Sequence, residues 1–110
     1  MQTGLFPFIL VQLKPSFFTR IEVTDISFIE TEGHYAKLVT TKHSYLIRTS
    51  LTQLEQVLPA DLFCRVHRAY IVQLSRIIHI NENLIQLENK DIPLGKPYRK
   101  NLFDRMQIIK

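Results

Sequence analysis

The chain has 110 residues, of which 45% are hydrophobic and 22% charged, and this size and composition are those of one globular domain with a single core. Its longest apolar stretch, Leu5–Val11, is too short to span a bilayer, and no basic segment precedes it as in a signal peptide. One cysteine excludes an internal disulfide and agrees with a reducing compartment, so we expect a cytoplasmic protein with no membrane partner.

The first half of the chain predicts short strands joined by turns. Its apolar residues are mainly Phe, Ile and Val with polar residues between them, a pattern typical of strands. Gly33 supplies a turn, because glycine adopts a positive φ at little cost. We expect strands at Leu5–Leu13, Phe17–Val23, Ile26–Glu30, Tyr35–Thr41 and His43–Thr49, which together form a β-meander.

A helix is predicted to begin after Ser50. Ser50 and Gln53 have the spacing of a capping box, and leucines at 51, 54 and 58 fall on one face. Pro59 ends this helix.

The second half adds strands and a C-terminal helix. Strands are expected at Arg76–Ile80, Leu84–Glu88 and Ile92–Leu94. Pro97 then opens an amphipathic helix whose apolar face carries Tyr98, Leu102, Met106 and Ile109. The predicted fold class is therefore mainly β with two short helices. A helix-turn-helix is disfavoured, because several strands separate the two helices.

The positive charge lies in the second half of the chain. Residues 1–64 hold five Lys/Arg against six Asp/Glu, whereas residues 65–110 hold nine against four, a balance of +5. A basic half on a small domain favours a nucleic-acid partner, although a basic surface exposed only to solvent predicts the same composition.

Three predicted turns carry cationic or donor side chains, at residues 33–37, 65–68 and 95–100. Lys and Arg neutralise phosphates, Arg also pairs with a guanine edge, and a Tyr hydroxyl donates to phosphate oxygens. The candidate nucleic-acid contacts are His34, Tyr35, Arg65, His67, Arg68, Lys96, Tyr98, Arg99 and Lys100.

Each candidate also has a structural interpretation. His34 is then a polar turn residue, and His67 a half-buried side chain bonded to a backbone carbonyl. Arg65 pairs with Asp61 or Glu55 instead of DNA, and Arg99 and Lys100 form the solvated face of the last helix.

An enzyme is the main alternative class. His34 and His67 with Lys96 would suit acid–base cleavage of a phosphodiester, but nothing in the sequence brings the two imidazoles together. Cys64 and His67 have no second pair with zinc-ligand spacing. We therefore expect no catalytic residue, no metal and no cofactor. A third class is a protein-interaction module whose basic face meets an acidic partner.

The most specific motif is Phe63-Cys64-Arg65-Val66-His67-Arg68-Ala69-Tyr70-Ile71-Val72. Before it stand Ile26-Ser27-Phe28-Ile29-Glu30, Gly33-His34-Tyr35 and Arg48-Thr49-Ser50-Leu51, and after it Ile92-Pro93-Leu94-Gly95 with Tyr98-Arg99. In this order, over roughly residues 18–108, the sequence resembles the LytTR domain, the DNA-binding output module of many bacterial response regulators. Residues 1–17 would then be an N-terminal strand or extension, and residues 18–110 the DNA-binding domain.

The resemblance implies an elongated arrangement of antiparallel β-sheets whose loops, not a recognition helix, enter the major groove. It assigns base contacts to His34, Arg68 and the Lys96 region, with phosphate contacts from Arg65, Tyr98, Arg99 and Lys100. Ala69 stands where the family usually has serine, which removes one phosphate hydrogen bond. Gly95-Lys96-Pro97 also departs from the family pattern.

The implied partners are double-stranded DNA with promoter direct repeats, two copies of the domain per site, an upstream receiver domain and a sensor kinase. No receiver pattern occurs within the 110 residues. The chain is thus expected to be either a C-terminal domain or a stand-alone regulator.

Overall fold

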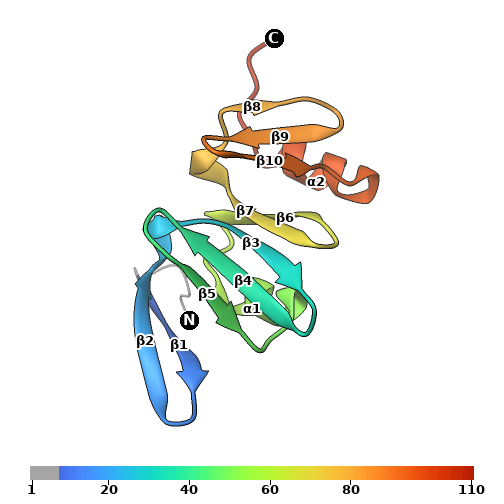
Figure 1. Cartoon of the computed structure of the whole chain (residues 1–110). Helices are drawn as coiled ribbons and strands as arrows, with labels where there is room; N and C mark the ends of the chain where they lie inside the picture. The colour runs from blue at the N-terminus through green and yellow to red at the C-terminus, as the bar shows by residue number, and fades with distance from the viewer. Residues whose placement is uncertain (1–7) are drawn as a thin grey trace.

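The computed structural model describes residues 8–110, so Leu5 to Pro7 of the first predicted strand lie outside the described residues. The molecule is elongated, with extents of 49 × 31 × 24 Å. Figure 1 shows a three-stranded sheet at one end, a five-stranded sheet in the middle and a two-stranded hairpin at the other end. The expected mainly β architecture with two short helices is confirmed.

The central sheet has the strand order β5-β4-β3-β7-β6, and every neighbouring pair is antiparallel. Strands β3, β4 and β5 form a meander, and β6 and β7 form a later hairpin. The two parts join where β7 pairs with β3, through Phe28↔Val72, Ile29↔Ile71 and Glu30↔Tyr70. The strands are β3 (Ile26–Glu32), β4 (Tyr35–Thr40), β5 (Ser44–Ile47), β6 (Phe63–His67) and β7 (Tyr70–Gln73).

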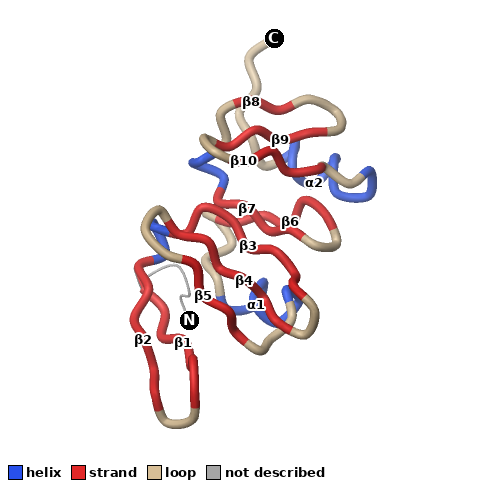
Figure 2. Tube along the Cα trace, in the orientation of Figure 1, coloured by secondary structure: helices blue, strands red, loops and turns tan. Residues whose placement is uncertain are grey.

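Two smaller sheets flank the central one. The first is the hairpin of β1 (Phe8–Lys14) and β2 (Phe17–Glu22), which corrects the prediction that these strands continue the meander. The second consists of β8 (His79–Ile80), β9 (Leu84–Leu87) and β10 (Lys90–Pro93). Helix α1 (Leu51–Val57) packs on the central sheet, and α2 (Arg99–Asp104) packs near β6 (Figure 2).

The central sheet has an apolar core on each face. Successive residues of a strand point to opposite faces, so neighbours in one strand belong to different cores. Ile71 belongs to the core under α1, together with Leu51 and Leu54. Its neighbour Val72 belongs to the second core, between the central and three-stranded sheets, with Val66 and other apolar residues. Apolar residues of the Phe63–Val72 motif therefore anchor it in both cores.

The capping box of α1 is present, since Ser50 Oγ accepts from the Gln53 amide at 3.1 Å and the Gln53 side chain accepts from the Ser50 amide. The strand predicted at Arg76–Ile80 is mostly wrong: a 3₁₀ turn at Leu74–Arg76 precedes a strand of only two residues. This segment crosses between sheets: the Arg76 guanidinium donates to the Thr24 carbonyl, whereas pairing with β9 begins only at Ile78 and His79.

The C-terminal helix is shorter than predicted. It ends at Asp104, and Ile109 is 99% exposed instead of facing the core. At this end the Arg105 amide donates to the Leu102 carbonyl at 3.1 Å, and the Arg105 guanidinium donates to the Phe63 carbonyl of β6 at 2.8 Å. Met106 still packs against the second core.

Candidate nucleic-acid interface

The turn between β3 and β4 consists of Gly33 and His34. Gly33 has φ 62° and His34 does not have a positive φ, which is the pattern of a two-residue type II′ turn. This turn matches the twist of its strands and holds His34 at the tip. The side chains of His34 and Tyr35 are exposed, and the Arg48 guanidinium lies 5.9 Å from the centre of the Tyr35 ring.

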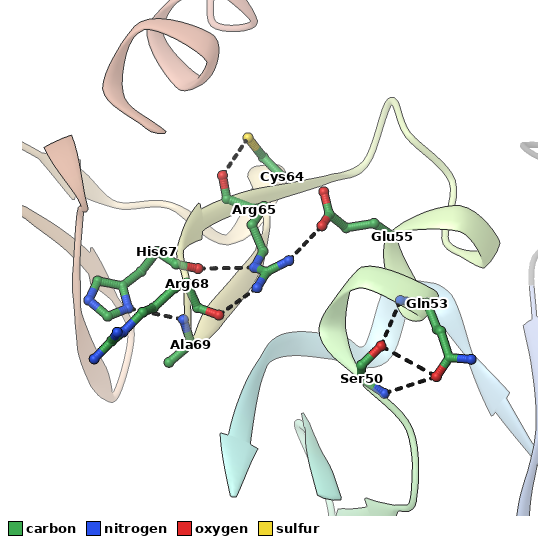
Figure 3. A network of polar contacts seen from close by, with 8 residues as sticks. All are labelled: Ser50, Gln53, Glu55, Cys64, Arg65, His67, Arg68 and Ala69. Atoms are coloured by element: carbon green, nitrogen blue, oxygen red, sulfur yellow. Dashed lines mark hydrogen bonds and ion pairs between the residues drawn. The ribbon is translucent and has the colours of Figure 1, made fainter. Parts of the chain in front are cut away.

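The turn between β6 and β7 consists of Arg68 and Ala69, and its backbone is fastened at several points (Figure 3). The Ala69 amide donates to His67 Nδ1 at 3.1 Å, and the Thr31 amide donates to the Ala69 carbonyl at 3.0 Å. The His67 ring also packs edge-on against Tyr70, with 5.7 Å between ring centres. The Arg68 side chain remains exposed at the end of a rigid turn.

Arg65 is engaged within the protein. Its Nε donates to the His67 carbonyl at 3.1 Å, one terminal nitrogen donates to the Arg68 carbonyl at 2.5 Å, and the other pairs with Glu55 at 2.6 Å. The Arg65 side chain is 17% exposed, compared with 43% for Glu55. Of the two acidic partners considered from the sequence, Glu55 is therefore the one that Arg65 meets.

The third turn is the 3₁₀ turn Lys96–Tyr98 that leads into α2. The register of β6 and β7 shifts between Arg65 and His67, so Val66 is the extra residue of a β-bulge and its carbonyl is available. The Gly95 amide donates to that carbonyl at 2.8 Å. A Cβ on Gly95 would lie 3.1 Å from Tyr98 Cδ2, so a residue without a side chain allows this close approach.

The polar residues around this turn differ in how exposed they are and in whether they already have a partner. Lys96 is exposed, and Tyr98 is half-buried against the second core. Arg99 is half-buried and donates to Asn83 Oδ1 at 2.6 Å. Lys100 pairs with Asp104 at 2.7 Å on the surface of α2, and the hydrogen bond to this carboxylate raises the pKa of Lys100.

The three turns lie along one edge of the molecule, which we call the three-turn edge: Gly33–His34, Arg68–Ala69 and Gly95–Tyr98. The Thr31–Ala69 bond joins strand β3, which leads into the first turn, to the second turn, and the Gly95–Val66 bond joins the third turn to strand β6, which leads into the second. Figure 1 shows the tips of the β3–β4 and β6–β7 hairpins and the start of α2 on the same side of the fold. Three exposed side chains that can contact nucleic acid, His34, Arg68 and Lys96, come from segments up to 62 positions apart in the sequence.

One expectation about His67 is wrong in detail. It is half-buried as expected, but its ring accepts from the Ala69 amide, and no bond from the ring to a carbonyl is found within residues 8–110. With Nδ1 as the acceptor, the neutral ring carries its proton on Nε2. Glu55 was already one of the two acidic partners considered for Arg65 from the sequence, and its place in the second turn of α1 brings it to the guanidinium.

Cys64 is buried beside Arg105 and Asn101 at the start of the second core. Burial raises the pKa of its thiol, and the positive charge of Arg105 offsets this only in part. Within residues 8–110, no three His, Cys, Asp or Glu side chains gather in a way that could hold a metal ion.

The family model described as the LytTr DNA-binding domain matches residues 17–107. The chain belongs to this family. Its LytTR fold is also seen in a solved LytTr DNA-binding domain from Bacillus cereus, with a TM-score of 0.78 over 91% of this chain and 96% of that one, at 18% identity. DNA binding is thus the function of the family to which the chain belongs.

Curated relatives of this LytTR domain are longer proteins. It is 32% identical to the sensory transduction protein LytT of Bacillus subtilis (strain 168), over 80% of this chain and 39% of that protein. It is 29% identical to the heme-containing CO-sensing transcriptional regulator RcoM 2 of Paraburkholderia xenovorans (strain LB400), over 81% and 36% respectively. The chain thus spans less than two-fifths of the length of each of these relatives. No helix among the described residues is both long and apolar enough to cross a membrane.

Proposed function

We propose that the three-turn edge binds double-stranded DNA sequence-specifically, with His34, Arg68 and Lys96 directed at base edges in the major groove. The observation that supports this most is the convergence of three exposed side chains on turns that backbone bonds tie together, from β3 to the Arg68–Ala69 turn and from Gly95 to β6. Turns held in this way keep their spacing, so they can meet successive base pairs with little loss of conformational entropy.

Affinity independent of sequence would come from phosphate contacts. We assign these to Tyr98, Arg99 and Lys100 at the start of α2, and to Tyr35 beside Arg48. The Lys100–Asp104 pair is fully exposed and is easily exchanged for a phosphate, since such surface pairs contribute little. Arg65 is the weakest candidate for this role, because all three of its guanidinium nitrogens already have partners.

We also propose that the domain acts as the output part of a bacterial transcriptional regulator in the cytoplasm. Support comes from the greater length of its relatives and from their names, which describe sensory transduction and transcriptional regulation. In a two-component system the remaining part would be a receiver domain answering to a sensor kinase. Two copies of the domain on direct repeats would account for DNA binding without a large protein interface.

Selection of bound sequences from a random duplex pool tests the proposal. The purified chain is expected to enrich a defined motif and to retain the selected duplex over its scrambled version at physiological salt. A second copy of the motif in direct repeat should add a second bound protein, which analytical ultracentrifugation measures. Failure to retain any duplex would favour the protein-interaction module and contradict the proposal.

A catalytic role is not part of this proposal. His67 uses Nδ1 to hold the Ala69 amide, and this use leaves only Nε2 for chemistry. Incubation of labelled DNA and RNA with the protein, with and without divalent metal, should leave both intact. Turnover that disappears in His34→Ala would instead support a phosphodiesterase.

A further inference from the structure

We propose that Arg65 and Glu55 are positioning residues that set the conformation of the Arg68–Ala69 turn, and that neither contacts DNA. This inference rests on the proposed function, since it concerns how Arg68 is presented to a base. It changes the role of Arg65, which the resemblance alone assigns to phosphate binding.

The guanidinium of Arg65 reaches both carbonyls that precede Ala69. Its Nε meets the His67 oxygen at 3.1 Å and a terminal nitrogen meets the Arg68 oxygen at 2.5 Å (Figure 3). These two bonds turn both peptide planes toward the protein. The Arg68 side chain is therefore left to point away from the body of the domain, where it is exposed.

Glu55 fixes the other side of the same guanidinium. Its carboxylate comes from α1, whose position is set by the capping box at Ser50 and by burial of Leu51 and Leu54. The 2.6 Å pair therefore connects a rigid helix to the turn. A planar guanidinium can satisfy three such acceptors in fixed directions, whereas an ammonium on a flexible stem cannot do so in the same geometry.

The charge balance argues against a direct phosphate contact. Arg65 and Glu55 together have no net charge, so the pair adds little attraction for a polyanion. The Arg65 side chain is also only 17% exposed, and its three kinds of nitrogen are already bonded. Binding a phosphate would require breaking contacts that hold the turn.

A double-mutant cycle tests the proposal. Arg65→Lys keeps the positive charge but removes the planar guanidinium that bonds three acceptors at once. Affinity for the selected duplex should therefore fall about tenfold. Affinity for the scrambled duplex should stay unchanged. In an Arg68→Ala background, Arg65→Lys should have no further effect, because it acts only through Arg68.

The free protein supplies a second readout. Backbone amide exchange at Arg68 and Ala69, measured by NMR without DNA, should be faster in Arg65→Lys than in the unmodified chain. Glu55→Gln should also speed amide exchange at Arg68 and Ala69, but by less. Because the Glu55 side chain is partly exposed, this variant keeps the proposal testable if Arg65→Lys fails to fold. The matched controls are Arg20→Lys and Glu22→Gln, which alter an exposed 2.7 Å pair on β2.

Independent, multiplying losses in the Arg68→Ala background would overturn the proposal. Unchanged amide exchange in both variants would also overturn it. If the unmodified protein preferred no duplex sequence, the proposed function would fail, whereas the amide exchange would still decide whether Arg65 and Glu55 hold the turn.

Discussion

Replacing Arg68 with alanine separates base reading from folding. The Arg68 side chain is exposed and makes no hydrogen bond or ion pair within residues 8–110. Its removal should change the free energy of unfolding by no more than about 0.5 kcal/mol, as is usual for such surface positions. If the guanidinium pairs with a base edge, the loss on the selected duplex is about 1–3 kcal/mol, which corresponds to roughly 5- to 150-fold in affinity.

The control is Lys42→Ala, which removes the same charge from an exposed turn at the opposite end of β4. The six residues of β4 span about 20 Å, so Lys42 is well removed from the tip that carries His34. Any general effect of lowering the net charge should appear equally in both variants.

Fluorescence anisotropy at fixed salt, with selected and scrambled duplexes, measures the effect. Arg68→Ala is expected to lose most of the preference for the selected duplex, and Lys42→Ala to keep it. Equal losses in the two variants would show that Arg68 contributes only charge. An unchanged preference in Arg68→Ala would refute the assignment of base reading to this turn.

Four further predictions concern the fold that supports the interface. Gly33→Ala should cost about 1–2 kcal/mol of stability in urea unfolding, from backbone strain alone, since nothing lies within 4 Å of the added Cβ; an unchanged midpoint would contradict the positive φ. Gln73→Leu should cost about 1–3 kcal/mol, because the buried amide donates to the Ile26 carbonyl at 2.7 Å and to two neighbouring carbonyls; retention of full thermal stability would contradict this. Because burial raises the pKa of the Cys64 thiol, the folded state retains its proton longer, so stability should decline as the pH rises above the ordinary thiol pKa, and the decline should be absent in Cys64→Ala. Deleting residues 1–16 should lower the melting temperature, because Val11 is buried in the first core, while the preference for the selected duplex persists if DNA contact lies wholly within residues 18–110.

Local chemistry made much of the architecture predictable. The capping box at Ser50 and the glycine turn before His34 depend on neighbours within a few residues, so the sequence alone was enough to place them. Val66 and Val72 lie on adjacent strands, β6 and β7, and both belong to the second core.

Local patterns failed where the chain changes sheets. Leu74–Arg76 has strand-like neighbours but forms a 3₁₀ turn, because the segment must cross from β7 to β8 and Arg76 bonds back to Thr24. The last helix also ends at Asp104, where the Arg105 guanidinium donates to the Phe63 carbonyl of β6. Both outcomes depend on contacts between residues about 40 to 50 positions apart.

By itself, the sequence determined that three basic turns exist, which residues they carry and which family motif they belong to. Only the tertiary structure decided that the turns share one edge, because this follows from the pairing of β3 with β7 and from the Val66 bulge that accepts the Gly95 amide. It also decided between two partners for Arg65. Asp61 lies closer in sequence, but α1 brings Glu55 to the guanidinium, and the charge that looked free to bind phosphate is held within the protein.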